Sequence, residues 1–350
     1  QLPIYMMESK LVATPLDAAH GTPLRCDGSS AAGRTAYDDY QFYGRRRDRV
    51  VLVGSNDGVL HAFHNGDIVS EDCAANTQVY NQGNGKEVWG FIPPDLLPRL
   101  QECVPGHIYG VDGDIMVRDI WSDRNNDNTK QWDEFHTVAI VGEGRGGTHY
   151  FALDLQWQAN QSDGHTSGLQ GDAAPPRFLW MFPQPGTPTS AIVGKTIANI
   201  APKPPPIGPV LLQKTGGKTR TVGSFSGETE ERWVVALPGG WSPGRERGRG
   251  VYVVAAYTGI VDARSGNNKP RDNLIAKFEF TESASGDLAP LSAMGQSVAA
   301  PVALVDYGPN SGSVQDGFFD TAIWGDVNGQ VWLARMMTPG ERTLCVSFEA

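Results

Sequence analysis

The chain has 350 residues, of which 40% are hydrophobic, and its formal net charge is −10. This hydrophobic share can bury a core, which excludes wholesale disorder, and the acidic balance argues against nucleic acid or an anionic lipid surface as the main partner. The 42 glycines and 24 prolines suit short strands joined by turns.

Residues 1–47 are predicted to be an irregular segment that forms, at most, the edge of the first structural unit. The stretch 27–40 is polar and rich in glycine, which is typical of a loop. The N-terminus has no signal peptide, and the chain starts as though cut from something larger, so any targeting sequence is expected outside it. No stretch approaches the roughly 18–20 consecutive apolar residues of a membrane span.

A β-hairpin is predicted at Asp48–His64, where two apolar runs flank Asn56-Asp57-Gly58. Asn or Asp before Gly readily takes the positive φ of a tight turn. The same form returns at Ile323–Arg335, around an Asp-Val-Asn-Gly turn, and two fainter echoes lie at 138–155 and 251–266. A hairpin that returns at long, irregular spacing favours one all-β repeat domain with insertions, a modified β-propeller over residues 48–350.

Between these hairpins the pattern predicts further strands and a single short helix. A third strand is expected at Glu87–Ile92, a helix after Pro93-Pro94 at 96–104, and another hairpin at His107–Trp121. The turn Gly144–Gly147 resembles a phosphate-binding loop, but no GK[ST] and no helical pattern follow it. We therefore interpret it as a connection between strands.

A first candidate calcium loop runs from Asp123 to Glu134. Oxygen-bearing side chains fall at its positions one, three, five, nine and twelve, and position seven offers a carbonyl, which is the ligand spacing of an EF-hand loop. The sixth position is Asn128 rather than Gly, and a strand pattern follows where an EF-hand has a helix; a solvated acidic turn is the alternative. The predicted ligands are Asp123, Asn125, Asp127, Thr129, Gln131 and Glu134.

A second candidate calcium loop lies just before the closing hairpin. Its acidic residues are Asp306, Asp316 and Asp320, and the last two have the spacing of the second half of a nine-residue acidic loop. An insertion, GPNSGSVQ, separates Asp306 from that half.

The four cysteines are widely spaced and form no CxxC pair that would indicate zinc. Cys73 and Cys103 bracket one insertion and are the preferred disulfide candidates for an oxidising compartment. A Cys26–Cys345 bridge and four free thiols are the alternatives.

Signatures of an enzyme are weak. The chain contains no G-x-S-x-G elbow, no H-E-x-x-H and no P-loop. His61 and His64 are three residues apart on a predicted strand, so they point to opposite faces and form a poor chelate. A non-catalytic role is therefore favoured.

The hairpin segments, taken in order, resemble the C-terminal β-propeller of the PilY-type tip adhesins of type IV pili. The resemblance covers residues 48–335 and is carried by VVLVGSNDGVLHAF, EVWGFIPPDLLPRL, HIYGVDG, HTVAIVGEGRGGTHYFALDL, APVALVDY and DTAIWGDVNGQVW. Residues 156–243 are the most divergent part.

This resemblance implies a modified propeller of about seven blades that acts at the pilus tip in surface attachment, pilus biogenesis and twitching motility. It implies export through the periplasm to the cell surface, and minor pilins and a host or abiotic surface ligand as partners. The calcium loop of the family maps onto Asp306, Asp316 and Asp320. The family's adhesive domain is expected in a preceding region.

Two other functions remain open. Propellers that bind pyrroloquinoline quinone share hairpins of this type, but their adjacent cysteine pair is missing here. A propeller scaffold that binds a protein partner without calcium is the second alternative.

Overall fold

The structure is a computed structural model of the whole chain. It describes residues 35–44, 47–72, 77–103, 106–123, 129–155, 175–184, 192–202, 205–213, 229–257, 273–282, 286–306, 317–335 and 346–348. None of the helices among these residues is long and apolar enough to cross a membrane.

Antiparallel strands dominate the described residues. The first sheet contains β1 (Arg49–Gly54), β2 (Leu60–Gly66) and β5 (Glu87–Phe91), and a separate hairpin contains β3 (Ile68–Asp72) and β4 (Thr77–Tyr80). The second sheet contains β6 (Ile115–Trp121), β7 (Phe135–Gly142), β8 (Tyr150–Asp154) and β9 (Arg177–Phe182).

Two more four-stranded sheets follow, and helices are few. The third sheet contains β10 (Ile207–Gln213), β11 (Thr229–Pro238), β12 (Gly250–Ala255) and β13 (Leu274–Glu279). The fourth contains β14 (Val302–Val305), β15 (Thr321–Gly325), β16 (Val331–Arg335) and β17 (Val346–Phe348). The described helices are α2 (Ala36–Gly44) and the 3₁₀ turns η2 (Leu97–Cys103), η3 (Trp132–Glu134) and η5 (Gly286–Ala293).

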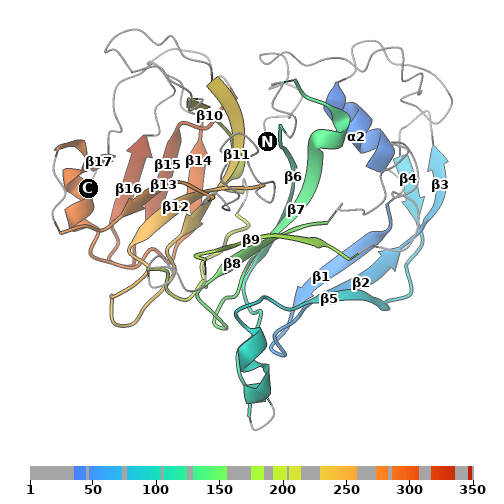
Figure 1. Cartoon of the computed structure of the whole chain (residues 1–350), viewed down its shortest axis with the longest axis horizontal. Helices are drawn as coiled ribbons and strands as arrows, with labels where there is room; N and C mark the ends of the chain where they lie inside the picture. The colour runs from blue at the N-terminus through green and yellow to red at the C-terminus, as the bar shows by residue number, and fades with distance from the viewer. Residues whose placement is uncertain are drawn as a thin grey trace, which may run out of the picture.

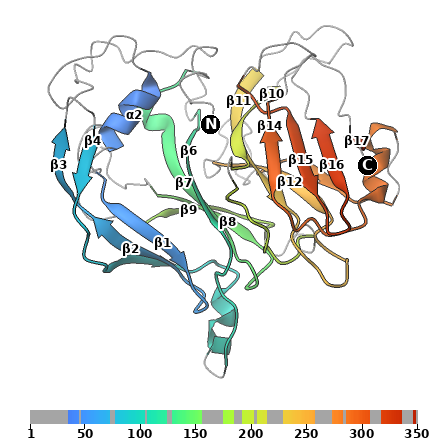
Figure 2. The same ribbon diagram turned by 180° about the vertical axis from the view of Figure 1, so that it is seen from behind.

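Each four-stranded sheet is a meander in which every strand pairs with the next strand of the chain. The sheets stand side by side in chain order, from the blue β1–β2–β5 sheet to the red β14–β17 sheet, and η2 projects from the edge below them (Figures 1 and 2). The prediction of a chain built mostly of β-strands is thereby confirmed for the described residues.

Alternating residues of one strand serve different cores, because successive side chains of a strand point to opposite faces. On β7, Val141 packs in the core shared with the first sheet, whereas Val138 and Ile140 pack in the core shared with the third sheet. On β12, Val254 belongs to the core between the second and third sheets, and Val253 belongs to the core shared with the fourth sheet. The second and third sheets are therefore buried on both faces.

The two hairpins that the sequence predicts most clearly are both present. Gly54 pairs with Leu60 across the first turn, and Gly325 pairs with Val331 across the last. Gly58 and Gly329 have φ of +89° and +82°, the left-handed conformation that these tight turns require. The hairpin formed by β7 and β8 confirms the connecting role of the Gly144–Gly147 turn.

Two local predictions were wrong. Residues 36–44, expected to be irregular, form α2, which starts at a capping box: the Asp38 amide donates to Thr35 Oγ1, and the Thr35 amide donates to Asp38 Oδ2. The predicted hairpin at His107–Trp121 contributes only β6, because Val111 donates instead to the carbonyl of Ser55 in the first turn.

A propeller of about seven blades is not detected within the described residues, which hold four larger sheets and one hairpin. The boundary between residues 1–47 and 48–350 stays a prediction.

Candidate functional site

The first predicted calcium loop is described only at its two ends, and Asn125 and Asp127 lie outside the described residues. Glu134, the predicted closing ligand, is buried, and its Oε2 accepts hydrogen bonds from Trp121 Nε1 (3.1 Å) and from the Gln131 amide (3.2 Å). The bond from the Gln131 amide is part of the capping box of η3. The carboxylate of Glu134 therefore stabilises the start of η3 and binds the Trp121 indole, a structural role that the loop spacing did not indicate.

Within this loop, Lys130 forms an ion pair with Glu231 in the interior. Lys130 Nζ lies 3.0 Å from Glu231 Oε2, and the two side chains are 1% and 0% exposed. Glu231 Oε1 also accepts a hydrogen bond from Trp233 Nε1 at 2.9 Å. Burial raises the pKa of Glu231, and the nearby Lys130 opposes that shift. The pair joins the β6–β7 connection to β11.

The second predicted calcium loop brings Asp306 and Asp320 together, and Asp316 lies outside the described residues. Val305 and Thr321 form the last pair of the β14–β15 ladder, and the two aspartates flank that pair on opposite strands. Both are buried, at 5% and 4% exposure.

Local hydrogen bonds fix these two aspartates. Asp306 Oδ2 accepts from the Gly317 amide at 2.7 Å, and Asp320 Oδ1 accepts from the Thr321 hydroxyl at 2.7 Å. Carboxylate oxygens are the hard ligands that calcium takes, so the residue types at this position fit a calcium ion.

The predicted disulfide partners are not placed. Cys26, Cys73 and Cys345 lie outside the described residues, and of Cys103 only its backbone position at the end of η2 is described. The Cys73–Cys103 pairing stays a prediction.

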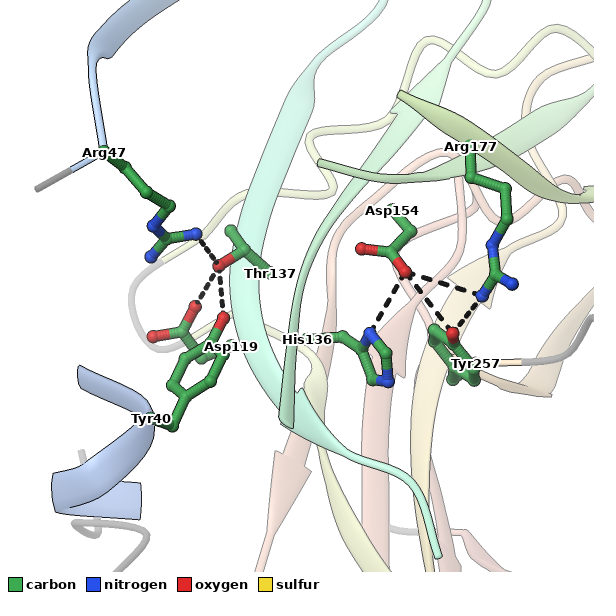
Figure 3. A network of polar contacts seen from close by, with 8 residues as sticks. All are labelled: Tyr40, Arg47, Asp119, His136, Thr137, Asp154, Arg177 and Tyr257. Atoms are coloured by element: carbon green, nitrogen blue, oxygen red, sulfur yellow. Dashed lines mark hydrogen bonds and ion pairs between the residues drawn. The ribbon is translucent and has the colours of Figure 1, made fainter. Parts of the chain in front are cut away.

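A polar network spans β7 and both of its neighbouring layers (Figure 3). On one side, the Thr137 hydroxyl donates to Asp119 Oδ1 at 2.7 Å, so it accepts from Tyr40 Oη at 2.7 Å and from Arg47 Nη1 at 2.8 Å. Burial raises the pKa of Tyr40, so its hydroxyl stays protonated and donates. These bonds attach α2 to the second sheet.

On the other side of β7, Asp154 Oδ2 is a shared acceptor. His136 Nδ1 lies 3.0 Å from it, the Tyr257 hydroxyl 3.3 Å, and Arg177 Nη2 3.5 Å (Figure 3). The His136 and Tyr257 rings stack with their centroids 4.2 Å apart. This half of the network ties β8 and β9 to the chain that follows β12, and we assign it a structural role.

A cluster that sequence reasoning missed lies beside η2. Asp95 precedes η2, while Glu143 and His149 lie at the two ends of the β7–β8 connection. His149 Nδ1 is 3.1 Å from Asp95 Oδ2 and 3.6 Å from Glu143 Oε2. The side chain of Glu143 is fully buried, while His149 and Asp95 keep 12% and 15% exposure.

The three groups of this cluster perturb one another strongly. Burial, and then Asp95, raise the pKa of Glu143 to about 7. Burial disfavours the charged form of His149, but hydrogen bonding to Asp95 and Glu143 outweighs it and raises the pKa of His149 to about 9. Burial likewise opposes the ionised form of Asp95, yet hydrogen bonding to His149 leaves its pKa lowered. Perturbed titrations of this kind are common at functional sites.

Glycines make room for this cluster. A Cβ on Gly147 would lie 1.6 Å from Glu143 Oε2, and a Cβ on Gly146 would lie 1.5 Å from the Gly110 carbonyl oxygen. Arg99 of η2 donates to the Gly146 carbonyl at 2.5 Å. The Gly-rich turn thus packs η2 and a buried carboxylate against the second sheet. The glycines of the segment GEGRGGTH were the sequence signal for this close packing, and sequence reasoning missed it.

A second group, Asp48, His64 and Asp67, places one donor atom from each residue within 4.8 Å of the others. Both nitrogens of its imidazole have partners: His64 Nδ1 accepts from the Asn84 amide at 3.2 Å, and Nε2 donates to Asp67 Oδ1 at 2.8 Å. This leaves no nitrogen lone pair for a metal. On β2, His64 is buried whereas His61 lies on the more exposed face, which confirms that the two histidines point to opposite faces of the strand.

No family model matches the sequence. A segment of 131 residues, 37% of the chain, is 35% identical to a type IV pilus biogenesis factor PilY1 homolog of Xylella fastidiosa (strain Temecula1). The match covers 9% of that relative's length. The solved C-terminal domain of Pseudomonas aeruginosa PilY1 is similar with a TM-score of 0.45 and 19% identity, over 89% of this chain and 46% of that one. The resemblance to PilY-type proteins that the hairpins indicate is borne out over this segment, where the chain is similar to a type IV pilus biogenesis factor.

Proposed function

We propose that this chain is a type IV pilus biogenesis domain that acts at the pilus tip. The observation that carries the proposal is the 35% identity over 131 residues to a type IV pilus biogenesis factor. In this proposal the chain is exported through the periplasm and binds minor pilins at the tip. It contributes to surface attachment and twitching motility by binding rather than by catalysis.

The finer architecture is part of the same proposal. Meander sheets that share a core with a neighbouring sheet are the building units of a propeller, and the three four-stranded sheets have this form. We infer a modified propeller of about seven blades, whose remaining strands come from residues outside the described ranges.

Calcium regulation is assigned to the loop before the closing hairpin. Asp306 and Asp320 are buried beside the last pair of the β14–β15 ladder, and Asp316 follows in the same loop. A calcium ion bound there would neutralise both buried carboxylates and fix the approach to β15. The Asp123 loop is the second candidate, and it is weaker because Glu134 Oε2 already accepts two hydrogen bonds.

Calorimetric titration with calcium tests this assignment. We expect one site with a Kd of about 0.1–1 mM, the range of extracellular calcium modules. Asp306→Asn and Asp320→Asn should each weaken binding by more than tenfold, because each removes a charge from the ligand set. Asp127→Ala reports on the first loop, and the control is Asp133→Asn, which changes an exposed acid within that loop that is not a predicted ligand.

Calcium binding that persists in both Asp306→Asn and Asp320→Asn but is lost in Asp127→Ala would move the site to the first loop. No heat of binding at millimolar calcium would remove calcium from the proposal altogether.

The biological role is tested by complementation in the organism that encodes the chain. Deletion should abolish surface pili and twitching zones, and the wild-type gene should restore both. The Asp306→Asn strain should be piliated but show twitching that no longer responds to calcium. Normal pili and twitching in the deletion strain would contradict the pilus role, whatever the calorimetry shows.

A further inference from the structure

The cluster Asp95–Glu143–His149 has the donor set of a transition-metal site. It combines one imidazole with two carboxylates, and one donor atom from each residue lies within 4.8 Å of the others. Imidazole nitrogen is a common ligand of zinc, whereas calcium takes oxygen ligands only. This chemistry separates the cluster from the all-oxygen loops above.

The distances agree with tetrahedral coordination. Zinc bonds of 2.0–2.1 Å at tetrahedral angles place neighbouring ligand atoms about 3.3 Å apart. His149 Nδ1 lies 3.1 Å from Asp95 Oδ2 and 3.6 Å from Glu143 Oε2, on either side of that value.

A second observation points to a ligand. The Glu143 side chain is fully buried, and its Oε1 accepts no hydrogen bond from an N–H or hydroxyl donor among the described residues; its carboxyl neighbour Asp95 can bond to it only when the two groups share a proton. Asp95 Oδ1, also buried, accepts no such hydrogen bond there either. Buried carboxylate oxygens without donors are costly, and a cation would satisfy them. His149 and Asp95 keep enough exposure for an ion to enter from solvent.

We propose that Asp95, Glu143 and His149 bind one zinc ion, which fastens η2 to the β7–β8 turn. The ion would take Asp95 from the segment that leads into η2 and the other two ligands from the β7–β8 connection. Arg99 already joins η2 to this turn through the Gly146 carbonyl. The metal would therefore hold the projecting segment at a fixed angle to the sheets (Figure 1).

The test is titration of zinc chloride into the full chain after removal of metal with EDTA, with a chromophoric chelator as competitor. We expect one equivalent bound in the micromolar range or tighter. His149→Gln and Asp95→Asn should each weaken binding by more than about tenfold, since each removes a direct ligand. Zinc should also slow amide hydrogen exchange in residues 96–103.

The matched control is His64→Gln, which alters the other aspartate–histidine cluster and should leave zinc affinity unchanged. Circular dichroism and thermal unfolding without metal verify that each variant is folded. Because Glu143 is buried, Glu143→Gln is informative only if it folds, and the partly exposed Asp95 provides the decisive variant.

Zinc binding weaker than millimolar, or equal affinity in the wild type and both ligand variants, would overturn the site in favour of a protonated His149 paired with two carboxylates. Cobalt is a spectroscopic check, because tetrahedral Co²⁺ absorbs visible light far more strongly than octahedral Co²⁺. The calcium variant Asp306→Asn should keep its zinc, so failure of one proposal is distinguishable from failure of the other.

Discussion

At the scale of single residues, the interior of this chain depends on paired charges. Lys130 and Glu231 are both almost completely buried and lie 3.0 Å apart. Removing two charges from water is costly, so such a pair adds little stability by itself, whereas removing one partner leaves an uncompensated buried charge.

We therefore expect Lys130→Met to lower the free energy of unfolding by about 3–5 kcal/mol. The double variant Lys130→Met with Glu231→Met should recover most of that loss, because no charge remains buried. Lys277→Met, which changes an exposed lysine, should shift stability by less than about 1 kcal/mol. Chemical denaturation of the three variants measures these differences.

The pH dependence of the single variant provides a further check. Burial already raises the pKa of Glu231, and loss of Lys130 removes the charge that opposes this shift. A carboxyl whose pKa is raised by folding stabilises the fold at low pH and loses that contribution as pH rises. The deficit of Lys130→Met should therefore shrink as pH falls from 8 to 5. A constant deficit would mean that Glu231 is not the group left unpaired.

At the scale of elements, two hairpin turns share one requirement but differ in their surroundings. Gly58 and Gly329 both have positive φ. A Cβ on Gly58 would lie 2.8 Å from Leu100 Cδ2, whereas Gly329 has open space around it. Gly329 therefore isolates the backbone cost of the turn.

We expect Gly329→Ala to destabilise the chain by about 1–2 kcal/mol, the cost of a left-handed conformation for a residue with a side chain. Gly329→Asn should cost less, because Asn tolerates this conformation better than Ala. Thermal unfolding of both variants measures the difference. Equal losses of stability for Gly329→Ala and Gly329→Asn would indicate that the presence of a side chain, rather than the positive φ, causes the destabilisation.

The elements that sequence predicted well are those whose signal is local. The Asn-Asp-Gly and Asp-Val-Asn-Gly turns predict their hairpins because the same few residues determine the turn conformation. The helix α2 had a local signal too, the Thr35–Asp38 capping box, which the polar composition of its surroundings obscured. The hairpin predicted at His107–Trp121 was wrong because a long-range bond, from Val111 to Ser55, decides that segment.

The candidate sites divide in the same way. Asp306 and Asp320 belong to one short loop, so their spacing in the sequence was enough to predict that they lie close together. Asp95 and Glu143 are 48 positions apart in the sequence (143 − 95). They come together with His149 only because η2 packs onto the Gly-rich turn. No pattern of spacing carries that information.

At the scale of the whole molecule, the sheets act as walls between successive cores. Val253 and Val254 are neighbours on β12 and are 1% and 0% exposed, yet they belong to different cores. In a sheet with one face in water, one of two such neighbours would be exposed. The burial of both is the feature that makes the third sheet an internal layer.

We expect Val253→Ala and Val254→Ala to cost similar amounts, about 1.5–3 kcal/mol each, because each removes two buried carbon atoms and leaves a cavity. Val117→Ala, at a position on β6 that is 48% exposed, should change stability by less than about 0.5 kcal/mol. The free energies of unfolding in urea provide the comparison.

The outcome discriminates between arrangements of the sheets. A large loss of stability for Val254→Ala with almost none for Val253→Ala would mean that the fourth sheet does not cover the third sheet in solution. Equal losses require both neighbours to be in place, since a cavity costs stability only where packed side chains surround it. A ring of blades needs this two-sided burial in every internal sheet, and the valine pair tests it where the chain offers the sharpest contrast.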